Sequence, residues 1–138
     1  MKKAITITVS LILLLLSLTA CNTSGEIKNC ERSISESALY TEDEINEIMD
    51  IVADYFKAEF EGCSLLTLTY DEGYSNEWSA DWAQQYEADR AIVFLSDFYV
   101  SPTGDNGCLN TDVTYKKWGW ILTQTDNENW VLRTWGYG

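Results

Sequence analysis

The sequence has no histidine and a single proline, and its nine lysines and arginines stand against 22 aspartates and glutamates. Without histidine it lacks the commonest general base and zinc ligand, and no pair among its four cysteines has the spacing of a zinc site. We therefore expect no metal and no cofactor. The acidic excess repels phosphate backbones and anionic lipid headgroups, so nucleic acid is an unsuitable partner.

A long apolar run occurs once, in residues 4–19, after a basic start at residues 1–3. This order is typical of a secretory signal. At its end, Leu18-Thr19-Ala20-Cys21 resembles the lipobox of bacterial lipoproteins. The resemblance implies that residues 1–20 are a lipoprotein signal peptide and that Cys21 receives palmitate or a similar acyl chain. The protein is then held at the extracytoplasmic face of the cell membrane. The alternative is an uncleaved membrane helix.

From Cys21 onward the chain holds seven basic and all 22 acidic residues, a balance of −15. Residues 21–38 are polar and aperiodic, and we expect a flexible tether leading to a single domain over residues 39–138. Three further cysteines remain, Cys30, Cys63 and Cys108. We expect a disulfide between Cys63 and Cys108 because both flank predicted strands; a buried free thiol at Cys63 is the alternative.

The clearest helix begins at the capping box Thr41-Glu42-Asp43-Glu44 and runs to Gly62, a residue type that commonly ends helices. Apolar residues recur through it at helical spacing, which predicts that one face packs on a sheet. Two β-rich runs, residues 63–70 and 90–100, predict strands of that sheet. The turn-rich loop of residues 101–112 gathers oxygen atoms, but without the spacing of an EF-hand calcium site.

A second, shorter helix is predicted over residues 77–88, after a turn at residues 71–76. Trp78, Trp82 and Tyr86 fall four residues apart and form one stripe on this helix. The stripe either closes one end of the core with its rings or forms the rim of a pocket whose wall is the C-terminal hairpin.

Four of the six tryptophans lie in residues 115–137, which we predict to be two strands joined by a polar turn over residues 126–129. The register places Trp120 opposite Trp135 and Gly119 opposite Gly136. Paired glycines in a sheet favour a bend or a close approach by another group. One face of the hairpin then carries Trp118, Trp120, Leu122, Val131, Arg133, Trp135 and Tyr137. The other face carries Gly119, Ile121, Thr123, Trp130, Leu132, Thr134 and Gly136.

The order of long helix, strand, short helix and three strands predicts an α+β fold, a curved four-stranded antiparallel sheet wrapped around the long N-terminal helix. Residues 42–62, Tyr70-Asp71-Glu72 and the two closing strands resemble small Gram-positive lipoproteins of uncharacterised function. The resemblance implies a cystatin-like roll of the nuclear transport factor 2-like type. Enzymes of that type usually place an Asp–His pair in the cone, so the missing histidine gives no catalytic residue to carry over.

The aromatic face of the hairpin predicts either core or a ligand pocket. Asp97 is the acid of most interest, because a carboxylate on an apolar strand needs a partner, either Arg133 or a backbone N–H. The candidate pocket residues are Trp82, Tyr86, Asp97, Trp118, Trp120, Arg133, Trp135 and Tyr137.

The function expected from these features is a lipid-anchored extracytoplasmic binding or adaptor domain, without catalysis. Its partner would be a small ligand or an envelope protein. Two alternatives remain open. One is a carboxylate-dependent enzyme that uses Asp97 in a cone-shaped pocket, and the other is a modulator of an envelope protein.

Overall fold

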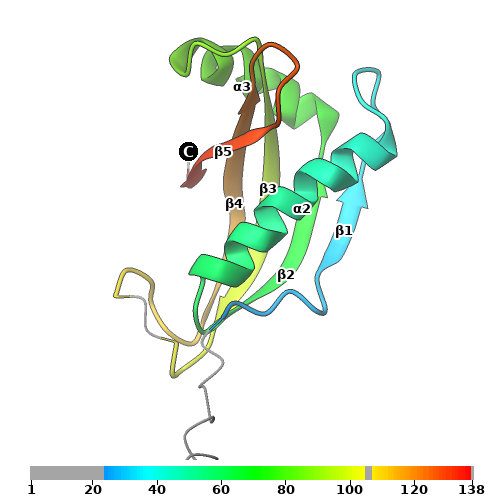
Figure 1. The fold of residues 1–138 in the computed structure, drawn as a ribbon. Helices are drawn as coiled ribbons and strands as arrows, with labels where there is room; N and C mark the ends of the chain where they lie inside the picture. The colour runs from blue at the N-terminus through cyan, green and yellow to red at the C-terminus, as the bar shows by residue number, and fades with distance from the viewer. Residues whose placement is uncertain (1–23, 105–106, 138) are drawn as a thin grey trace, which may run out of the picture.

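The computed structural model describes residues 24–104 and 107–137. The signal peptide and Cys21 lie outside the described residues. The described part has two helices and one five-stranded sheet in the order β1-β2-β3-β4-β5, with β1 and β5 at its edges (Figure 1). The elements are β1 Glu31–Ile34, α2 Glu42–Glu59, β2 Cys63–Tyr70, α3 Glu72–Gln85, β3 Arg90–Val100, β4 Val113–Gln124 and β5 Val131–Gly136. The α+β class is confirmed, but the sheet has five strands instead of four and is mixed instead of antiparallel.

The additional strand comes from the segment predicted to be a tether. β1 runs parallel to β2, from Glu31 opposite Thr67 to Ile34 opposite Tyr70. Upstream, the Gly25 N–H donates to the Lys57 carbonyl at 2.9 Å. This correction has a physical reason. β1 is joined to β2 through backbone groups and to α2 through the polar Arg32 side chain, which pairs with Asp50. Its side chains are mostly exposed, so no apolar pattern marks the strand.

Helix α2 begins where the sequence predicts. The Thr41 hydroxyl accepts the Glu44 N–H, and the Glu44 carboxylate accepts the Thr41 N–H, which completes the capping box. The helix follows β1 and so does not open the domain. Its apolar face is buried against the sheet and contributes Ile45, Ile48, Met49, Val52 and Phe56 to the core. Burial of each such side chain contributes roughly 1.5–3 kcal/mol.

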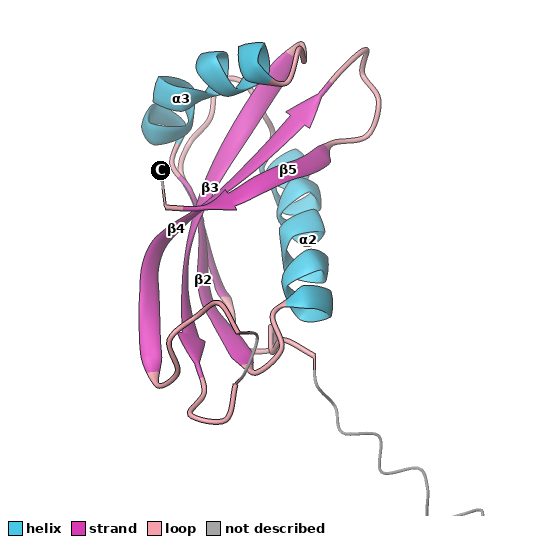
Figure 2. Ribbon diagram, turned by 90° about the vertical axis from the view of Figure 1, so that its left-hand side faces the viewer, coloured by secondary structure: helices cyan, strands magenta, loops and turns pink. Residues whose placement is uncertain are grey.

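Helix α3 lies on the opposite side of the sheet from α2 (Figure 2). It begins at Glu72, five residues earlier than predicted, because the Asp71 side chain caps it by accepting the Tyr74 N–H at 2.8 Å. The predicted turn over residues 71–76 is therefore wrong. The buried Ser75 hydroxyl accepts the Val93 N–H at 3.0 Å and joins this first turn to β3.

The predicted hairpin register is confirmed at its far end, where Trp120 pairs with Trp135 and Gly119 with Gly136. Nearer the turn it is wrong. The turn centres on Asp126 and Asn127, both at positive φ, a conformation that Asp and Asn tolerate better than other side chains. Leu122 consequently pairs with Leu132, which leaves Arg133 as the extra residue of a bulge.

The bulge exchanges the faces of the residues next to the turn. Leu132 and Trp130 pack against the core on the α2 side. Arg133 lies on the α3 side, where its Nε donates to the Thr123 hydroxyl at 2.8 Å, and Val131 is 43% exposed. The predicted face assignment of these four residues is thus corrected.

Candidate functional site

The structure divides the predicted pocket residues between the two faces of the sheet. Trp118, Trp120, Trp135 and Tyr137 form one aromatic cluster on the α2 side. In it, the Trp120 and Trp135 ring centroids are 6.2 Å apart, and those of Trp118 and Tyr137 are 5.2 Å apart. On the α3 side, Trp82 stacks on Tyr86 at 6.2 Å. These residues therefore do not share one pocket.

Arg133 belongs to the α3 side as well. Its guanidinium carbon lies 5.5 Å from the centroid of the Tyr86 ring, close enough for a cation–π contact. It does not meet Asp97. The Asp97 carboxylate instead accepts the backbone N–H of Lys117 at 2.9 Å. A backbone N–H was one of the two predicted partners. Lys117 has a φ of 55° at an irregularity of the β3–β4 ladder, so Asp97 supports a bulge.

The predicted disulfide is not formed. Cys63 and Cys108 are both thiols in the structure. Cys63 faces the core and is 1% exposed, whereas Cys108 lies at the surface of the loop. Burial raises the pKa of the Cys63 thiol to about 11, which keeps it protonated and unreactive at neutral pH. The alternative of a buried free thiol at Cys63 agrees with this arrangement.

One hollow, the aromatic pocket, lies between the C-terminal half of α2 and the aromatic cluster, with a volume of about 440 Å³. Trp118 and Trp135 are the two predicted residues that line it. The indole N–H of Trp118 is buried and has no hydrogen-bond partner in the part of the chain that the structure describes. The lining is Tyr55, Glu59, Phe60, Cys108, Leu109, Trp118 and Trp135.

A second hollow, the α3 groove, has a volume of about 370 Å³. Gly119 and Gly136 face each other in its floor, where neither places a side chain between the sheet and the helix. Trp78, 44% exposed, and Trp82 form its rim. The paired glycines therefore leave an apolar groove, with Asp81 as its acidic group. The predicted close approach by another group is not found at Gly136, where an added Cβ would meet no described atom within 4 Å.

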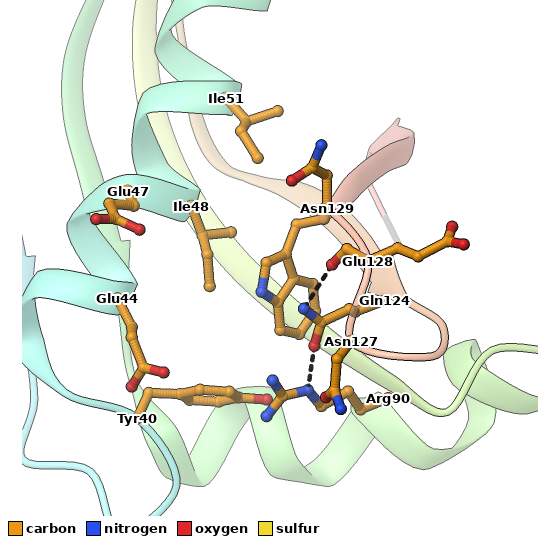
Figure 3. Close-up of a pocket in the computed structure, with 11 residues that line it drawn as sticks. Tyr40, Glu44, Glu47, Ile48, Ile51, Arg90, Gln124, Asn127, Glu128 and Asn129 are labelled. Atoms are coloured by element: carbon orange, nitrogen blue, oxygen red, sulfur yellow. Dashed lines mark hydrogen bonds between the residues drawn. The ribbon is translucent and has the colours of Figure 1, made fainter.

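A third hollow, the Arg90 pocket, is larger than the other two, at about 610 Å³ (Figure 3). It opens between the N-terminal half of α2 and the β4–β5 turn, with Arg90 and Tyr40 pointing toward each other at one end. It lies within the size range of small-molecule sites. Its lining is Tyr40, Glu44, Glu47, Ile48, Ile51, Arg90, Gln124, Asn127, Glu128, Asn129 and Trp130.

Arg90 is held on three sides. Its Nε donates to the Gln124 amide oxygen at 2.6 Å, and the Gln124 amide nitrogen donates in turn to the Glu128 carbonyl at 2.7 Å (Figure 3). The guanidinium carbon lies 5.3 Å from the Tyr40 ring centroid and 5.1 Å from that of Trp130. Each cation–π contact contributes about 0.5–1 kcal/mol at an exposed site. The guanidinium is thus fixed before any ligand arrives.

Three glutamates, Glu44, Glu47 and Glu128, line the same pocket, and Figure 3 shows the Glu128 carboxylate turned away from Arg90. None of them forms an ion pair with Arg90, since the one ion pair among residues 24–104 and 107–137 joins Arg32 to Asp50. Hydrogen bonds from the Thr41 backbone and hydroxyl hold the pKa of Glu44 below its usual value. Burial raises the pKa of Tyr40, an effect that Arg90 partly offsets through its charge and through a hydrogen bond with the Tyr40 hydroxyl. The pocket therefore combines one fixed cation with an acidic rim.

Arg90, Tyr40 and Gln124 are not among the pocket residues predicted from the sequence. The sequence does contain a signal for Arg90 and Gln124. Arg90 is a lone basic residue at the start of an apolar strand, and it pairs directly with Gln124 in the β3–β4 ladder. Aligning the two strands would have predicted that contact. The approach of Tyr40 and Trp130 depends on how α2 crosses the sheet, which no local pattern encodes.

Comparison with known proteins finds no matching family model, no similar curated protein and no similar solved structure. Within the described ranges, no helix combines the length and apolar character needed to cross a membrane. The same residues hold no group of three or more His, Cys, Asp or Glu side chains suited to a metal ion. Function is therefore inferred from the chemistry of the hollows.

Proposed function

We propose that the protein is a lipid-anchored extracytoplasmic domain that binds a small ligand in the Arg90 pocket and acts by contact, without catalysis. The lipobox resemblance of residues 18–21 supports the anchor and the location. The long helix packed on antiparallel strands supports a cystatin-like roll. The observation that carries the binding function is the Arg90 guanidinium, fixed by Gln124 and two rings inside a hollow of about 610 Å³.

A purely structural arginine would be expected to pair with a carboxylate in so acidic a chain. Arg90 does not, although three carboxylates line its pocket. The Tyr40 hydroxyl is hydrogen-bonded to the guanidinium. The remaining terminal N–H groups form no ion pair and can donate to a ligand, and the fixed side chain loses little further entropy on binding. These two properties are those of a preorganised recognition group.

Ligand-detected NMR tests this proposal. Cell-wall fragments, short peptides and small hydrophobic compounds would be added to the full chain in detergent micelles. We expect saturation transfer to at least one class, and its loss in Arg90→Gln. Arg32→Gln is the matched control, because Arg32 lies outside the pocket in an exposed ion pair. Equal binding by the Arg90 variant, or silence from every class, would contradict the proposal.

A second candidate function is contact with an envelope protein. β5 is an edge strand, in which Trp135 is 38% exposed, and Tyr137, which follows it, is 62% exposed. An exposed apolar edge is a surface on which a partner strand can add. Recovery of one specific membrane protein by the native chain, but not by Trp135→Lys, would support this function. Identical sets of captured proteins would oppose it.

The carboxylate-enzyme alternative has weaker support. The Asp97 carboxylate is engaged by the Lys117 N–H, and Asp97 lines neither the Arg90 pocket, nor the aromatic pocket, nor the α3 groove. A general base needs hydrogen-bond reach to a substrate proton. Turnover that is abolished by Asp97→Asn would nevertheless replace the binding proposal.

A further inference from the structure

We propose that the Arg90 pocket recognises a short peptide that carries both a free carboxylate and a primary amine, an inference that rests on the proposed binding function. Arg90 takes the carboxylate, and the acidic rim takes the amine. The charges, the hydrogen-bonding groups and the size of the pocket each support one part of this assignment.

The carboxylate is assigned to Arg90. Its Nε is already bonded to Gln124, and the Tyr40 and Trp130 rings lie within cation–π distance of the guanidinium. The terminal nitrogens form no ion pair with a protein carboxylate. A guanidinium offers two parallel N–H groups that match the two oxygens of a carboxylate. The fixed plane of Arg90 makes such a pair directional.

The amine is assigned to the acidic rim. Glu47 and Glu44 lie one turn apart on α2, and Figure 3 shows both side chains on the helix side of the pocket, across from the β4–β5 turn. One Glu44 oxygen is used by the Thr41 N–H. The Glu47 carboxylate forms no ion pair and accepts no hydrogen bond from the described residues, so it is the stronger acceptor for an ammonium group.

The middle of the pocket suits peptide groups. Asn127 and Asn129 supply amide donors and acceptors from the turn, while Ile48 and Ile51 form an apolar wall on the helix. Side-chain amides can satisfy both the N–H and the C=O of a bound peptide unit. A ligand with a carboxylate, a backbone amide and an amine would use all three kinds of group.

Other ligand classes fit less well. A phosphate or dicarboxylate would bring excess negative charge against three glutamates. A simple cation would meet the Arg90 guanidinium. A purely apolar compound would displace water from the polar side chains of the pocket and offer them no hydrogen bonds in its place. The combination of one fixed cation and an acidic rim therefore selects a ligand with both charges.

The test uses the tripeptide Lys-Ala-Ala in three forms: unmodified, with its C-terminus amidated, and with both amines acetylated. Each is titrated into the full chain in detergent micelles by isothermal calorimetry. We expect the unmodified form to bind and each modified form to bind at least about tenfold more weakly, the equivalent of 1.4 kcal/mol. In Arg90→Gln, amidation should make no further difference. In Glu47→Gln, the penalty for acetylation should shrink.

Arg32→Gln controls for loss of a surface cation, and thermal melts of every variant verify folding. Equal binding of the three peptide forms, or an amidation penalty that persists in Arg90→Gln, overturns the inference. So does failure of all three peptides when neutral wall fragments bind in an Arg90-dependent manner, and that result leaves the binding function intact. If no compound binds, both proposals fail together.

Discussion

Ser96 is a polar side chain in the most buried layer of the protein, where it is 1% exposed. Its hydroxyl accepts the indole N–H of Trp120, itself fully buried, at 2.8 Å. Trp120 in turn lies beneath Tyr55 and Trp135, at 6.4 and 6.2 Å between ring centroids. This one hydrogen bond thus allows a large ring with a polar atom to fill the centre of the core.

Replacement of Ser96 by Ala leaves the indole N–H buried without an acceptor. We expect the free energy of unfolding to fall by about 1–3 kcal/mol, as measured by denaturant titration. Ser33→Ala, on an exposed position of β1, is the matched control. A loss for Ser96→Ala no greater than that of the control would show that the hydrogen bond does not stabilise the core.

At the scale of elements, Glu72 joins the chain before α2 to the first turn of α3. Its carboxylate accepts the Ser37 hydroxyl at 2.6 Å and the Ala38 N–H at 3.0 Å. The Ser37 hydroxyl and the Ala38 amide hold the pKa of Glu72 below its usual value. The segment between β1 and α2 is therefore fastened by a charged group.

This contact makes stability depend on pH. Because the folded-state pKa of Glu72 is depressed, its contribution is complete above the unfolded-state pKa of about 4.3 and is lost as pH falls through the folded value. We expect Glu72→Gln to have a lower melting temperature than the native chain at about pH 7. This difference in melting temperature should become smaller at about pH 3. A difference that stays constant over this range would contradict the role of the charge.

The segment that leads into β1 provides the second prediction for an element. A Cβ at Gly25 would lie 2.4 Å from the Phe56 carbonyl oxygen, so a larger residue must displace the segment or α2. We expect Gly25→Val to reduce the free energy of unfolding by about 1–3 kcal/mol. Lys28→Val introduces the same side chain at an exposed position of the same segment. If both variants match the native protein, residues 24–34 behave as the tether that the sequence predicted.

Elements that are stabilised by local sequence patterns were predicted correctly, and elements that depend on distant contacts were not. Strands β2 and β3 and the start of α2 carry apolar repeats or a complete capping box, so their boundaries follow from local patterns. β1 is held through its backbone and the polar Arg32 side chain, and the bulge at Arg133 depends on two turn residues at positive φ. Neither leaves a periodic signal. The Arg90 pocket combines four separate segments and requires the tertiary structure.

At the scale of the whole molecule, the negative net charge and the proposed lipid anchor both concern the location of the domain relative to the membrane. A lipid on Cys21 would hold a strongly anionic domain near the bilayer surface, and each buried methylene would contribute roughly 0.8 kcal/mol. We expect labelled palmitate to mark the native chain and not Cys21→Ser. If palmitate labels the Cys21→Ser variant, or does not label the native chain, the protein has no lipid anchor at Cys21.

The central claim is that the Arg90 pocket is the binding site. No tryptophan lines more than one of these three hollows, so indole N–H resonances report on them separately. The reporters are Trp130 for the Arg90 pocket, Trp118 for the aromatic pocket and Trp82 for the α3 groove. NMR of the full chain during titration with a small-molecule extract of the cell envelope measures all three at once. The account predicts that the Trp130 indole and Arg90 Nε–H signals move first and saturate together. A shift of the Trp118 or Trp82 indole signal while the Trp130 signal stays unchanged would contradict binding in the Arg90 pocket.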